Sequence, residues 1–452
     1  MKAIILAAGE GKRMNSSLPK VLHEILEKPV IHYVLDAVQS SGINQICVVL
    51  GHKREQIKNS ICTNKNIDFA VQVEQLGTGH AVMCASNFIE DSDDICILPG
   101  DTPLIRSEHL KEAMHKHKSS GNDITVISVV LQDPTGYGRI VRQGSDVKIV
   151  EHGDATQEQR QICEINTGIM CFKAEALKTA LSKLQSNNSQ SEYYLTDTLH
   201  IIQSDGGKAE AIALGQPQDF LGINTKVQLH EAARIMQTRI NEQHMLAGVN
   251  IIHSDTAYIS PSVTIGRDTL ISPNVTISGN TVIGENCTIG SNSTLTDMVL
   301  GDNVHILNSV ATTSVIKNGA HIGPFAYIRP NSEIGENVKI GDFVEIKNSV
   351  IGSNSKASHL TYIGDAVVGS GVNFGCGTVV VNYDGENKFT TTIEDGVFVG
   401  CNANLVAPVI VEKGAYIAAG STITETVPTK SLAIARSRQV NKTNWAKIPE
   451  CE

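Results

Sequence analysis

The sequence predicts a mostly parallel α/β domain followed by a parallel β-helix, and three patterns in the chain indicate this. The first half alternates short apolar runs with segments of helical length. In the second half, a large apolar residue recurs at every sixth position. Between the halves, residues 226–246 carry apolar side chains at the spacing of an amphipathic helix. We therefore expect two domains, at residues 1–225 and 249–452 with a C-terminal tail, joined by a helical linker at residues 226–248.

The composition narrows the class of protein. With 452 residues, of which 41% are hydrophobic, the chain can bury two or more cores. A net charge of −10 argues against nucleic acid or an anionic membrane as partner, because both select basic surfaces. The ten cysteines form no CxxC pair, which favours free thiols in a reducing compartment. No run of eighteen apolar residues occurs, so we expect a cytoplasmic protein.

The first half shows the alternation of a parallel α/β sheet. Apolar runs at residues 4–7, 46–50, 95–98 and 125–131 predict strands, and residues 29–40 predict a helix between two of them. In such sheets ligands bind at the carboxyl ends of the strands. The polar residues that follow each strand are therefore the candidates for function.

A glycine-containing loop follows the first predicted strand. Gly9 and Gly11 let backbone N–H groups approach a phosphate, and Arg13 and Lys20 add two positive charges nearby. The loop lacks the third glycine of the dinucleotide fingerprint and the GK[ST] of a P-loop. On its own it is equally compatible with a tight turn beside two surface cations.

Two further polar residues are candidate metal ligands. Asp101 follows an apolar strand in a Gly-Asp turn, where a carboxylate oxygen suits Mg²⁺, although Asp is also a common turn residue. Asn224 precedes the long predicted helix, so its alternative role is that of a helix N-cap.

The six-residue period in the second half runs in three registers. A period of six fits neither an α-helix nor a single strand, whereas three six-residue sides close one β-helical coil of about eighteen residues. We expect roughly nine coils, with ordinary sandwich strands as the alternative. The predicted inward residues are Ile259, Ile265, Ile271, Ile277, Ile283, Ile289 and Leu295; Ile316, Ile322, Ile328, Ile334, Ile340 and Ile346; and Ile393, Val399, Leu405, Val411, Ile417 and Ile423.

Taken in order, the motifs carry a family resemblance over nearly the entire chain. The glycine loop with Pro19-Lys20, the Gly77-Thr78-Gly79 run, Gly100-Asp101 and Asn166-Thr167-Gly168 resemble the sugar-nucleotide pyrophosphorylases, which have a Rossmann-like fold. The coils resemble the left-handed parallel β-helix of the hexapeptide acyltransferases. Both halves together resemble a bacterial family of bifunctional enzymes that make a nucleotide sugar.

The resemblance implies two reactions and a set of partners. The second half would transfer acetyl from acetyl-CoA to glucosamine 1-phosphate. The first half would then transfer uridylyl from UTP to N-acetylglucosamine 1-phosphate with Mg²⁺ as cofactor, releasing pyrophosphate. The product would supply peptidoglycan and lipopolysaccharide synthesis, and the β-helix would assemble a homotrimer.

The resemblance also assigns roles to residues of the first half. Lys12 and Pro99 depart from the family's usual residues, and Lys12 would add a charge near the triphosphate. The assigned residues are Leu6, Ala7, Ala8, Gly9, Arg13 and Lys20 for UTP or the sugar nucleotide; Gln72, Gly77 and Thr78 for uracil; Gly138, Glu151 and Asn166 for the sugar; and Asp101 and Asn224 for Mg²⁺, with Asn224 also at the nucleotide.

In the second half, His359 matches the family's catalytic base. Acetyl transfer needs an unprotonated amine, and histidine is the side chain best suited to accept that proton near neutral pH. The residues matching the glucosamine 1-phosphate site are Arg329, Lys347, Tyr362, Asn373 and Lys388, and those matching the acetyl-CoA site are Cys376, Asn382, Tyr383, Cys401, Ala419 and Arg436.

Three features of this half stand outside the repeat or the family pattern. Residues 382–385 interrupt the six-residue rhythm, which predicts a projecting loop. Cys376 and Cys401 stand where Ala and Ser are commoner, which would make the site sensitive to thiol reagents. The basic tail at residues 430–447 holds Trp445, and it is either solvated or docked over the coenzyme.

Two other functions remain open at this point. One is a nucleotidyltransferase with a single activity, whose β-helix only oligomerises or senses an effector; His359 and its Lys and Tyr partners argue against it. The other is a non-catalytic interaction protein, against which the glycine loop, Lys20 and Asp101 argue.

Overall fold

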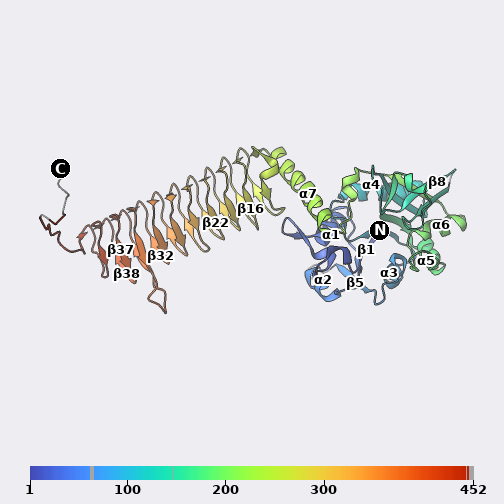
Figure 1. Cartoon of the computed structure of the whole chain (residues 1–452), viewed down its shortest axis with the longest axis horizontal. Helices are drawn as coiled ribbons and strands as arrows, with labels where there is room; N and C mark the ends of the chain where they lie inside the picture. Colours follow the sequence, from blue (N-terminus) through green and yellow to red (C-terminus); the bar gives the residue numbers. More distant parts are fainter. Residues whose placement is uncertain (62–65, 145, 444, 447–452) are drawn as a thin grey trace, which may run out of the picture. The chain divides into compact units, whose positions relative to one another are not determined.

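The computed structural model describes residues 1–61, 66–144, 146–443 and 445–446. The chain divides into two compact units, Met1–Met236 and Gln237–Glu452 (Figure 1). The boundary falls inside helix α7 (Lys226–Leu246), which has the bounds expected for the amphipathic helix. The contact pattern therefore assigns one half of this helix to each unit.

The N-terminal unit is built on one nine-stranded sheet. Its main path is β11 (Ala209–Ala213), β7 (Ile124–Val130), β10 (Glu164–Lys173), β6 (Asp94–Pro99), β1 (Lys2–Ala7), β4 (Ile46–Leu50) and β5 (Ile67–Val71). Strand β10 runs antiparallel to both of its neighbours on this path, whereas the other pairs are parallel. A hairpin of β8 (Arg139–Gln143) and β9 (Asp146–Val150) pairs with β10. The prediction of a mostly parallel α/β sheet is confirmed.

Helices cover both faces of this sheet. One apolar core contains residues of α1 (Val30–Ser40), α2 (Arg54–Ile61) and α4 (Ser107–Ser120). The other contains residues of α3 (Thr78–Cys84), α5 (Ala174–Ser182) and α6 (Asp197–Ser204). The sheet is therefore buried on both sides, as expected for parallel strands that are apolar along their whole length. The short elements are β2 (Glu24–Ile25), β3 (Lys28–Pro29) and the 3₁₀ turns η1 (Lys12–Met14), η2 (Lys20–Leu22), η3 (Ser86–Phe88), η4 (Gln159–Gln161) and η5 (Pro217–Phe220).

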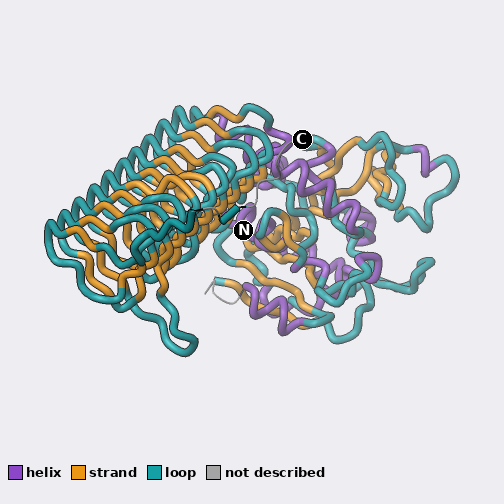
Figure 2. Tube along the Cα trace, turned by 60° about the vertical axis from the view of Figure 1, so that its left-hand side comes forward, coloured by secondary structure: helices purple, strands orange, loops and turns teal. Residues whose placement is uncertain are grey.

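The C-terminal unit is a triangular prism of short parallel strands, which Figure 2 shows as stacked orange segments joined by teal turns. Each coil adds one strand to each of three faces, and the turn η6 (Ser254–Thr256) lies between the first strand and the second. The first face contains β12 (Asn250–Ile251), β15 (Leu270–Ile271), β18 (Thr288–Ile289), β21 (His305–Ile306), β24 (His321–Ile322), β27 (Lys339–Asp342), β30 (Lys356–His359), β33 (Asn373–Phe374), β36 (Phe398–Val399), β39 (Tyr416–Ile417) and β41 (Leu432–Ala433).

The other two faces are built in the same way. The second face contains β13 (Tyr258–Ile259), β16 (Thr276–Ser278), β19 (Thr294–Thr296), β22 (Val310–Thr312), β25 (Tyr327–Ile328), β28 (Glu345–Lys347), β31 (Tyr362–Gly364), β34 (Val379–Val381), β37 (Asn404–Val406) and β40 (Thr422–Ile423). The third face contains β14 (Thr264–Ile265), β17 (Val282–Ile283), β20 (Val299–Leu300), β23 (Val315–Ile316), β26 (Glu333–Ile334), β29 (Val350–Ile351), β32 (Ala366–Val368), β35 (Thr391–Ile393) and β38 (Val409–Val411).

The predicted inward residues form the prism core. All are buried except Ile265, which is half-buried. Within the described residues the faces hold eleven, ten and nine strands, so the prism has about ten coils rather than the nine expected. The difference arises because β12 comes before the first of the three registers and β41 comes after the last. The six-residue period therefore predicted the architecture correctly and the coil number slightly too low.

A loop projects from the prism between β34 and β35 (Figure 1). Tyr383 and Lys388 pair across it as an antiparallel bridge, and the backbone N–H of Phe389 donates to the carbonyl of Asn382 at 2.9 Å. The interruption predicted at residues 382–385 is therefore a short hairpin-like excursion from the coil.

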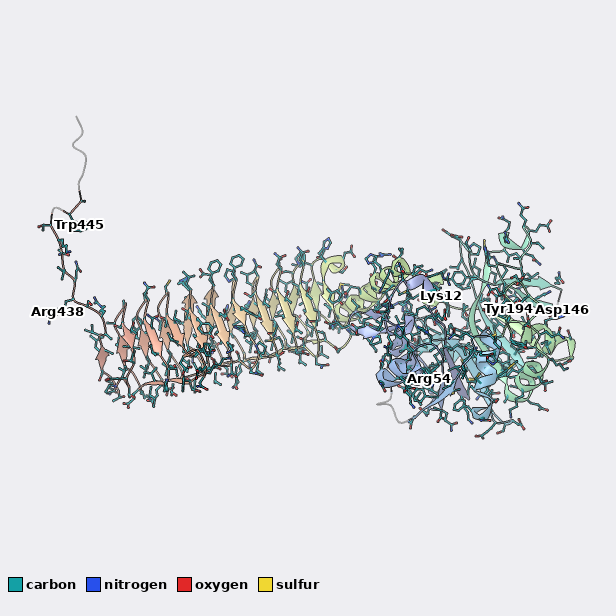
Figure 3. The ribbon with its side chains drawn as sticks, turned by 60° about the horizontal axis from the view of Figure 1, so that its bottom comes forward. Lys12, Arg54, Asp146, Tyr194, Arg438 and Trp445 are labelled. Carbon is teal, nitrogen blue, oxygen red and sulfur yellow. The ribbon has the colours of Figure 1, made fainter. Side chains whose placement is uncertain are left out.

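After β41 the described part of the tail leaves the prism, as the labelled Arg438 and Trp445 show in Figure 3. Trp445 is 78% exposed, and its ring contacts the amine of Lys442 at 5.2 Å. The end of the predicted basic tail, at residue 447, lies outside the described residues. Among the helices described, none is both long and apolar enough to cross a membrane.

Candidate active sites

A cleft of about 300 Å³ opens at the carboxyl ends of the central strands of the N-terminal unit. The glycine loop after β1, the segment after β5 and the turn after β6 meet there. The predicted residues in its lining are Leu6, Ala7, Ala8, Gly9, Lys20, Gln72, Gly77, Thr78 and Asp101, and Pro99, Gln75 and Glu192 join them.

The glycine loop carries its cations toward the predicted metal ligands. Gly11 adopts a left-handed backbone with φ of 66°, and a Cβ there would lie 2.8 Å from the Cβ of Lys20. Lys20 donates to the Oδ1 of Asn224 at 3.0 Å and forms an ion pair with Asp101. Arg13 also donates to the Oδ1 of Asn224, at 3.0 Å. These four residues therefore form one cluster at the cleft.

This cluster suits a divalent cation. An Oδ2 of Asp101 and the Oδ1 of Asn224 both accept from the single ammonium group of Lys20, so two oxygens converge on one cationic centre. Oxygen donors of this kind are the ligands that Mg²⁺ prefers, with phosphate oxygens and water completing its shell. The residues present therefore fit the ion that the resemblance implies.

A second group of predicted residues, those assigned to uracil, forms one wall of the same cleft. Gly77 has φ of 105° and ψ of 176°, a conformation open almost only to glycine. The side-chain amide of Gln72 donates to the carbonyl of Gly77 at 3.0 Å, and the backbone N–H of Leu195 donates to the hydroxyl of Thr78 at 3.0 Å. The wall is therefore held by one local contact and by one contact from a distant part of the chain.

The three residues assigned to the sugar also come together. The backbone N–H of Asn166 donates to the carbonyl of Gly138 at 2.8 Å, and a Cβ on Gly138 would lie 3.3 Å from both carboxylate oxygens of Glu151. Thr196 donates to Glu151 at 3.1 Å. Burial raises the pKa of Glu151. Since Leu195 contacts the uracil wall, residues 195–196 join the two groups.

The two residues of this unit that depart from the family pattern, Lys12 and Pro99, lie in different places. Lys12 forms an exposed ion pair with Glu10 at 2.7 Å and does not line the cleft, so the charge of Glu10 offsets the extra charge that the sequence predicted. Pro99 does line the cleft, where it packs against Gly168. Its ring therefore forms part of the cleft lining.

In the C-terminal unit, His359 lies at a corner of the prism opposite Asp342 of the preceding coil. The two residues are register partners in β30 and β27, and the Nδ1 of His359 lies 2.6 Å from the Oδ1 of Asp342. Hydrogen bonding to His359 lowers the pKa of Asp342. The carboxylate therefore fixes one ring nitrogen and leaves the Nε2 for chemistry.

Three other predicted residues lie at the same corner of the prism, on the coils that follow His359. The strands before and after the corner stay in register from coil to coil, so Cys376, Cys401 and Ala419 occupy positions equivalent to that of His359 in the next three coils. We call Asp342, His359, Cys376, Cys401 and Ala419 the corner column. Its far end is extended by Arg436, whose Cδ would lie 3.7 Å from a Cβ on Gly420.

A cluster of cations lies at the next corner, between the second and third faces. Lys347 and Lys388 face each other. This contact lowers the pKa of Lys388, and the charge of Arg329 adds to that lowering. Cations that crowd one another in this way favour an anion between them.

Polar partners fix the carboxylate within this cluster. Burial tends to raise the pKa of Asp365, but hydrogen bonds from Asn348 and Asn382 and the charge of Lys347 outweigh burial, so the pKa lies below its ordinary value. Asn382 is buried and its amide donates to Asp365 and lies 3.5 Å from the hydroxyl of Tyr362. A cavity of about 400 Å³ lies here, lined in part by Asn348, Asp365 and Lys388.

Within a single chain, only some of the residues predicted for this unit's sites lie close together. Arg329, Lys347, Tyr362 and Lys388 gather at the cation corner, where charge coupling links them. Asn373 lies instead on the first face, between Lys356 and Phe398. Tyr383 is exposed in the projecting loop and bonds to the carbonyl of Gly385.

Sequence reasoning missed several residues that the structure places in these sites. Asp342 lies seventeen residues before His359, one coil earlier, and that spacing could have indicated it. Asp365 and Asn348 belong to the cation corner, Glu192 lines the N-terminal cleft, and Thr196 donates to Glu151. The last two lie far along the chain from the motifs they contact, so no local pattern pointed to them.

Comparison with known families agrees with this division. A nucleotidyl transferase model matches residues 2–228, and a bacterial transferase hexapeptide model matches residues 262–297 and 390–425. A model of the GMPPB C-terminal domain matches residues 310–384. The fold and sites therefore define a two-domain transferase, with a nucleotidyltransferase domain followed by a left-handed parallel β-helix of hexapeptide repeats.

Individual relatives narrow this class. Bifunctional protein GlmU of Acetivibrio thermocellus is 52% identical over 98% of this chain and 97% of its own, and that of Clostridioides difficile is 49% identical over 99% and 97%. This chain belongs to the bifunctional GlmU family. A solved structure of UDP-glucose pyrophosphorylase complexed with UDP-glucose aligns with a TM-score of 0.45 at 17% identity, covering 53% of this chain and 98% of that one.

Proposed function

We propose that this enzyme makes UDP-N-acetylglucosamine in two steps. Its β-helix transfers acetyl from acetyl-CoA to glucosamine 1-phosphate, and its N-terminal domain transfers uridylyl from UTP to the resulting N-acetylglucosamine 1-phosphate, releasing pyrophosphate. The observation that carries the proposal is that each unit assembles its own polar constellation, the Lys20–Asp101–Asn224 cluster in one and the Asp342–His359 pair in the other. The product would serve peptidoglycan and lipopolysaccharide synthesis.

For uridylyl transfer, the chain supplies charge and position. The sugar phosphate attacks the α-phosphate of UTP, and this reaction depends on alignment and charge neutralisation more than on a base. Arg13 and Lys20 would bind phosphate oxygens beside the backbone of Gly9 and Gly11. The wall at Gln72, Gly77 and Thr78 would hold uracil, and Gly138, Glu151 and Asn166 would orient the sugar.

Mg²⁺ is the cofactor we assign to the first step. Asp101 and Asn224 would hold it through the oxygens that now accept from Lys20. When bound, the ion neutralises charge on the phosphates during transfer. Lys20 would then be released from these oxygens and turn to a phosphate.

For acetyl transfer, His359 is the base. It would remove a proton from the amino group of glucosamine 1-phosphate as that nitrogen attacks the thioester carbonyl, while Asp342 keeps the imidazole oriented. The crowded cations Arg329, Lys347 and Lys388 would bind the sugar phosphate, with Tyr362 and Asn373 at the sugar. Acetyl-CoA would lie along Cys376, Asn382, Tyr383, Cys401, Ala419 and Arg436.

The assembly we propose is a cytoplasmic homotrimer. Its support is that residues assigned to one acetyltransferase site lie on different sides of a single prism, so neighbouring chains would complete each site. We assign residues 1–225 to nucleotidyl transfer, 226–248 to the linker and 249–452 to acetyl transfer. Neither nucleic acid nor membrane is a proposed partner.

Two matched pairs of variants test the two activities separately. His359→Ala should abolish CoA release from acetyl-CoA with glucosamine 1-phosphate, whereas His305→Ala, on the same face of the prism, should not. Asp101→Ala should abolish pyrophosphate release from UTP with N-acetylglucosamine 1-phosphate, whereas the exposed Asp91→Ala should not. If the wild-type enzyme releases pyrophosphate but never CoA, the β-helix is a scaffold and the acetyltransferase proposal fails.

A further inference from the structure

The corner column places two thiols on consecutive coils. Cys376 follows β33 and Cys401 follows β36, and the strands on both sides of each turn are in register. The backbone N–H of Asn402 donates to the carbonyl of Cys376 at 2.8 Å, which fixes the two turns against each other. The two cysteines therefore lie one above the other, although the projecting loop separates them in sequence.

This stacking meets the backbone requirement for a disulfide. Neighbouring parallel strands lie about 4.8 Å apart. Disulfide-bonded cysteines have Cα atoms roughly 4.4–6.8 Å apart, with side chains directed to the same side. Equivalent positions in stacked turns direct their side chains alike, so a bridge needs rotation of the two thiols and only a small approach of the turns.

The pair is also open to reagents. Both cysteines are free; Cys401 is exposed and Cys376 half-buried. Another pair, Cys96 and Cys171, lies opposite in the central sheet but is completely buried, so solvent reagents do not reach it. Under the proposed function, the corner column must admit the pantetheine arm of the coenzyme, and a small disulfide needs no wider path.

We propose that Cys376 and Cys401 form a reversible modification site that reacts with small disulfides of the glutathione disulfide or coenzyme A disulfide type. One protein thiolate attacks the small disulfide, releasing one thiol and leaving a mixed disulfide on the protein. The second protein thiolate then attacks the protein-side sulfur and releases the second thiol. The protein dithiol loses two electrons and two protons, and the small disulfide gains them as two thiols.

The bridge would stop acetyl transfer while leaving uridylyl transfer intact. Cys376 occupies the position equivalent to His359 in the next coil, so a bridge from Cys376 to Cys401 crosses the surface on which the thioester is presented to His359. This consequence rests on the proposed acetyltransferase function. Formation of the bridge itself does not, because it depends only on the two thiols.

The test treats the full-length enzyme with glutathione disulfide or coenzyme A disulfide and follows three quantities. Intact mass and peptide mapping should show a Cys376–Cys401 bridge, with the loss of two hydrogens. CoA release should be lost and pyrophosphate release retained, and dithiothreitol should restore CoA release. Faster bridging by coenzyme A disulfide than by glutathione disulfide would identify the coenzyme as its source, and equal rates would identify the cellular disulfide pool.

Variants make the test decisive. Cys376→Ala and Cys401→Ser should each stop at a mixed disulfide on the remaining cysteine, whereas the exposed Cys163→Ser should bridge like the wild type. The proposal is overturned if mapping finds no bridge in the wild type. It is also overturned if the bridged enzyme releases CoA at the same rate as it did before treatment. An enzyme that releases no CoA before treatment, yet forms the bridge on treatment, would refute the proposed function instead.

Discussion

Replacing Gly77 by alanine should damage the uracil wall of the N-terminal cleft by an amount that the structure lets us estimate. The residue has φ of 105° and ψ of 176°, and an added Cβ would lie 2.7 Å from the carbonyl oxygen of Tyr193 and 2.9 Å from the Cβ of Glu192. Two backbone hydrogen bonds of 2.8 Å, from Gly79 to Tyr193 and from Tyr193 to Leu76, hold these segments together. Alanine therefore has to strain the backbone and separate the segments.

The two costs add to a measurable loss. A side chain forced into this backbone region costs about 1–3 kcal/mol. Losing one of the two hydrogen bonds costs about 1 kcal/mol more. We expect the N-terminal unit to lose roughly 2–4 kcal/mol, which for a unit of this size lowers its melting temperature by roughly 4–16 °C.

The assay combines unfolding with kinetics. Gly42→Ala is the matched control, because Gly42 also has a positive φ, of 94°, but has open space where the Cβ would lie. It should lose only the strain contribution and keep the wild-type KM for UTP. Gly77→Ala should melt lower than this control and raise the KM for UTP, with the activity of the β-helix unchanged.

A result opposite to this would refute the reasoning. If Gly77→Ala melted no lower than Gly42→Ala, the contact with Tyr193 would carry no cost. If it melted lower but kept the wild-type KM, the wall would not contact the nucleotide.

Three other substitutions have expected outcomes. Because burial raises the pKa of Glu151, its stabilising contribution is present below the ordinary value of 4.5 and is lost as pH rises through the raised pKa. Glu151→Gln should therefore raise the urea midpoint of the N-terminal unit at neutral pH but not in acid, while increasing the KM for the sugar phosphate; an unchanged midpoint at neutral pH would contradict this. Ile346→Ala, at a fully buried position, should cost the β-helix about 2–5 kcal/mol by denaturant unfolding, and a cost below that range would mean that the prism collapses around the cavity. Asp342→Asn should slow CoA release and spare pyrophosphate release, and equal CoA release by variant and wild type would show that the carboxylate does not orient His359.

The fold was largely predictable because both halves repeat a simple local rule. Every predicted inward residue of the six-residue registers lies in the prism, because one aliphatic side chain on each side of a coil is enough to define which position faces the core. In the N-terminal unit, the four apolar runs predicted β1, β4, β6 and β7 to within two residues, whereas β5, β8, β9, β10 and β11 were not predicted. The antiparallel direction of β10 depends on long-range pairing that no local run encodes.

The sites were predictable in their members but not in their arrangement. Family motifs indicated His359, Cys376 and Cys401 separately. Their alignment along one corner was hidden because the spacing along the chain is irregular. The coil between His359 and Cys376 is one residue short, and the projecting loop lengthens the coil between Cys376 and Cys401. In the same way, Lys20 and Asn224 carry no local sign that they share a hydrogen bond, because the sheet brings them together from positions about two hundred residues apart.

The prism also has a thermal consequence. Each coil contacts only the coil before and the coil after it, so the stack behaves as a one-dimensional solid whose melting begins at its free ends. His359 lies several coils inside the stack, whereas Arg436 lies just beyond the last strand. On warming, local opening reaches the Arg436 end of the corner column before it reaches His359. Amide hydrogen exchange should therefore rise along the column toward Arg436, and affinity for the coenzyme should decline at temperatures where the geometry around His359 is still intact.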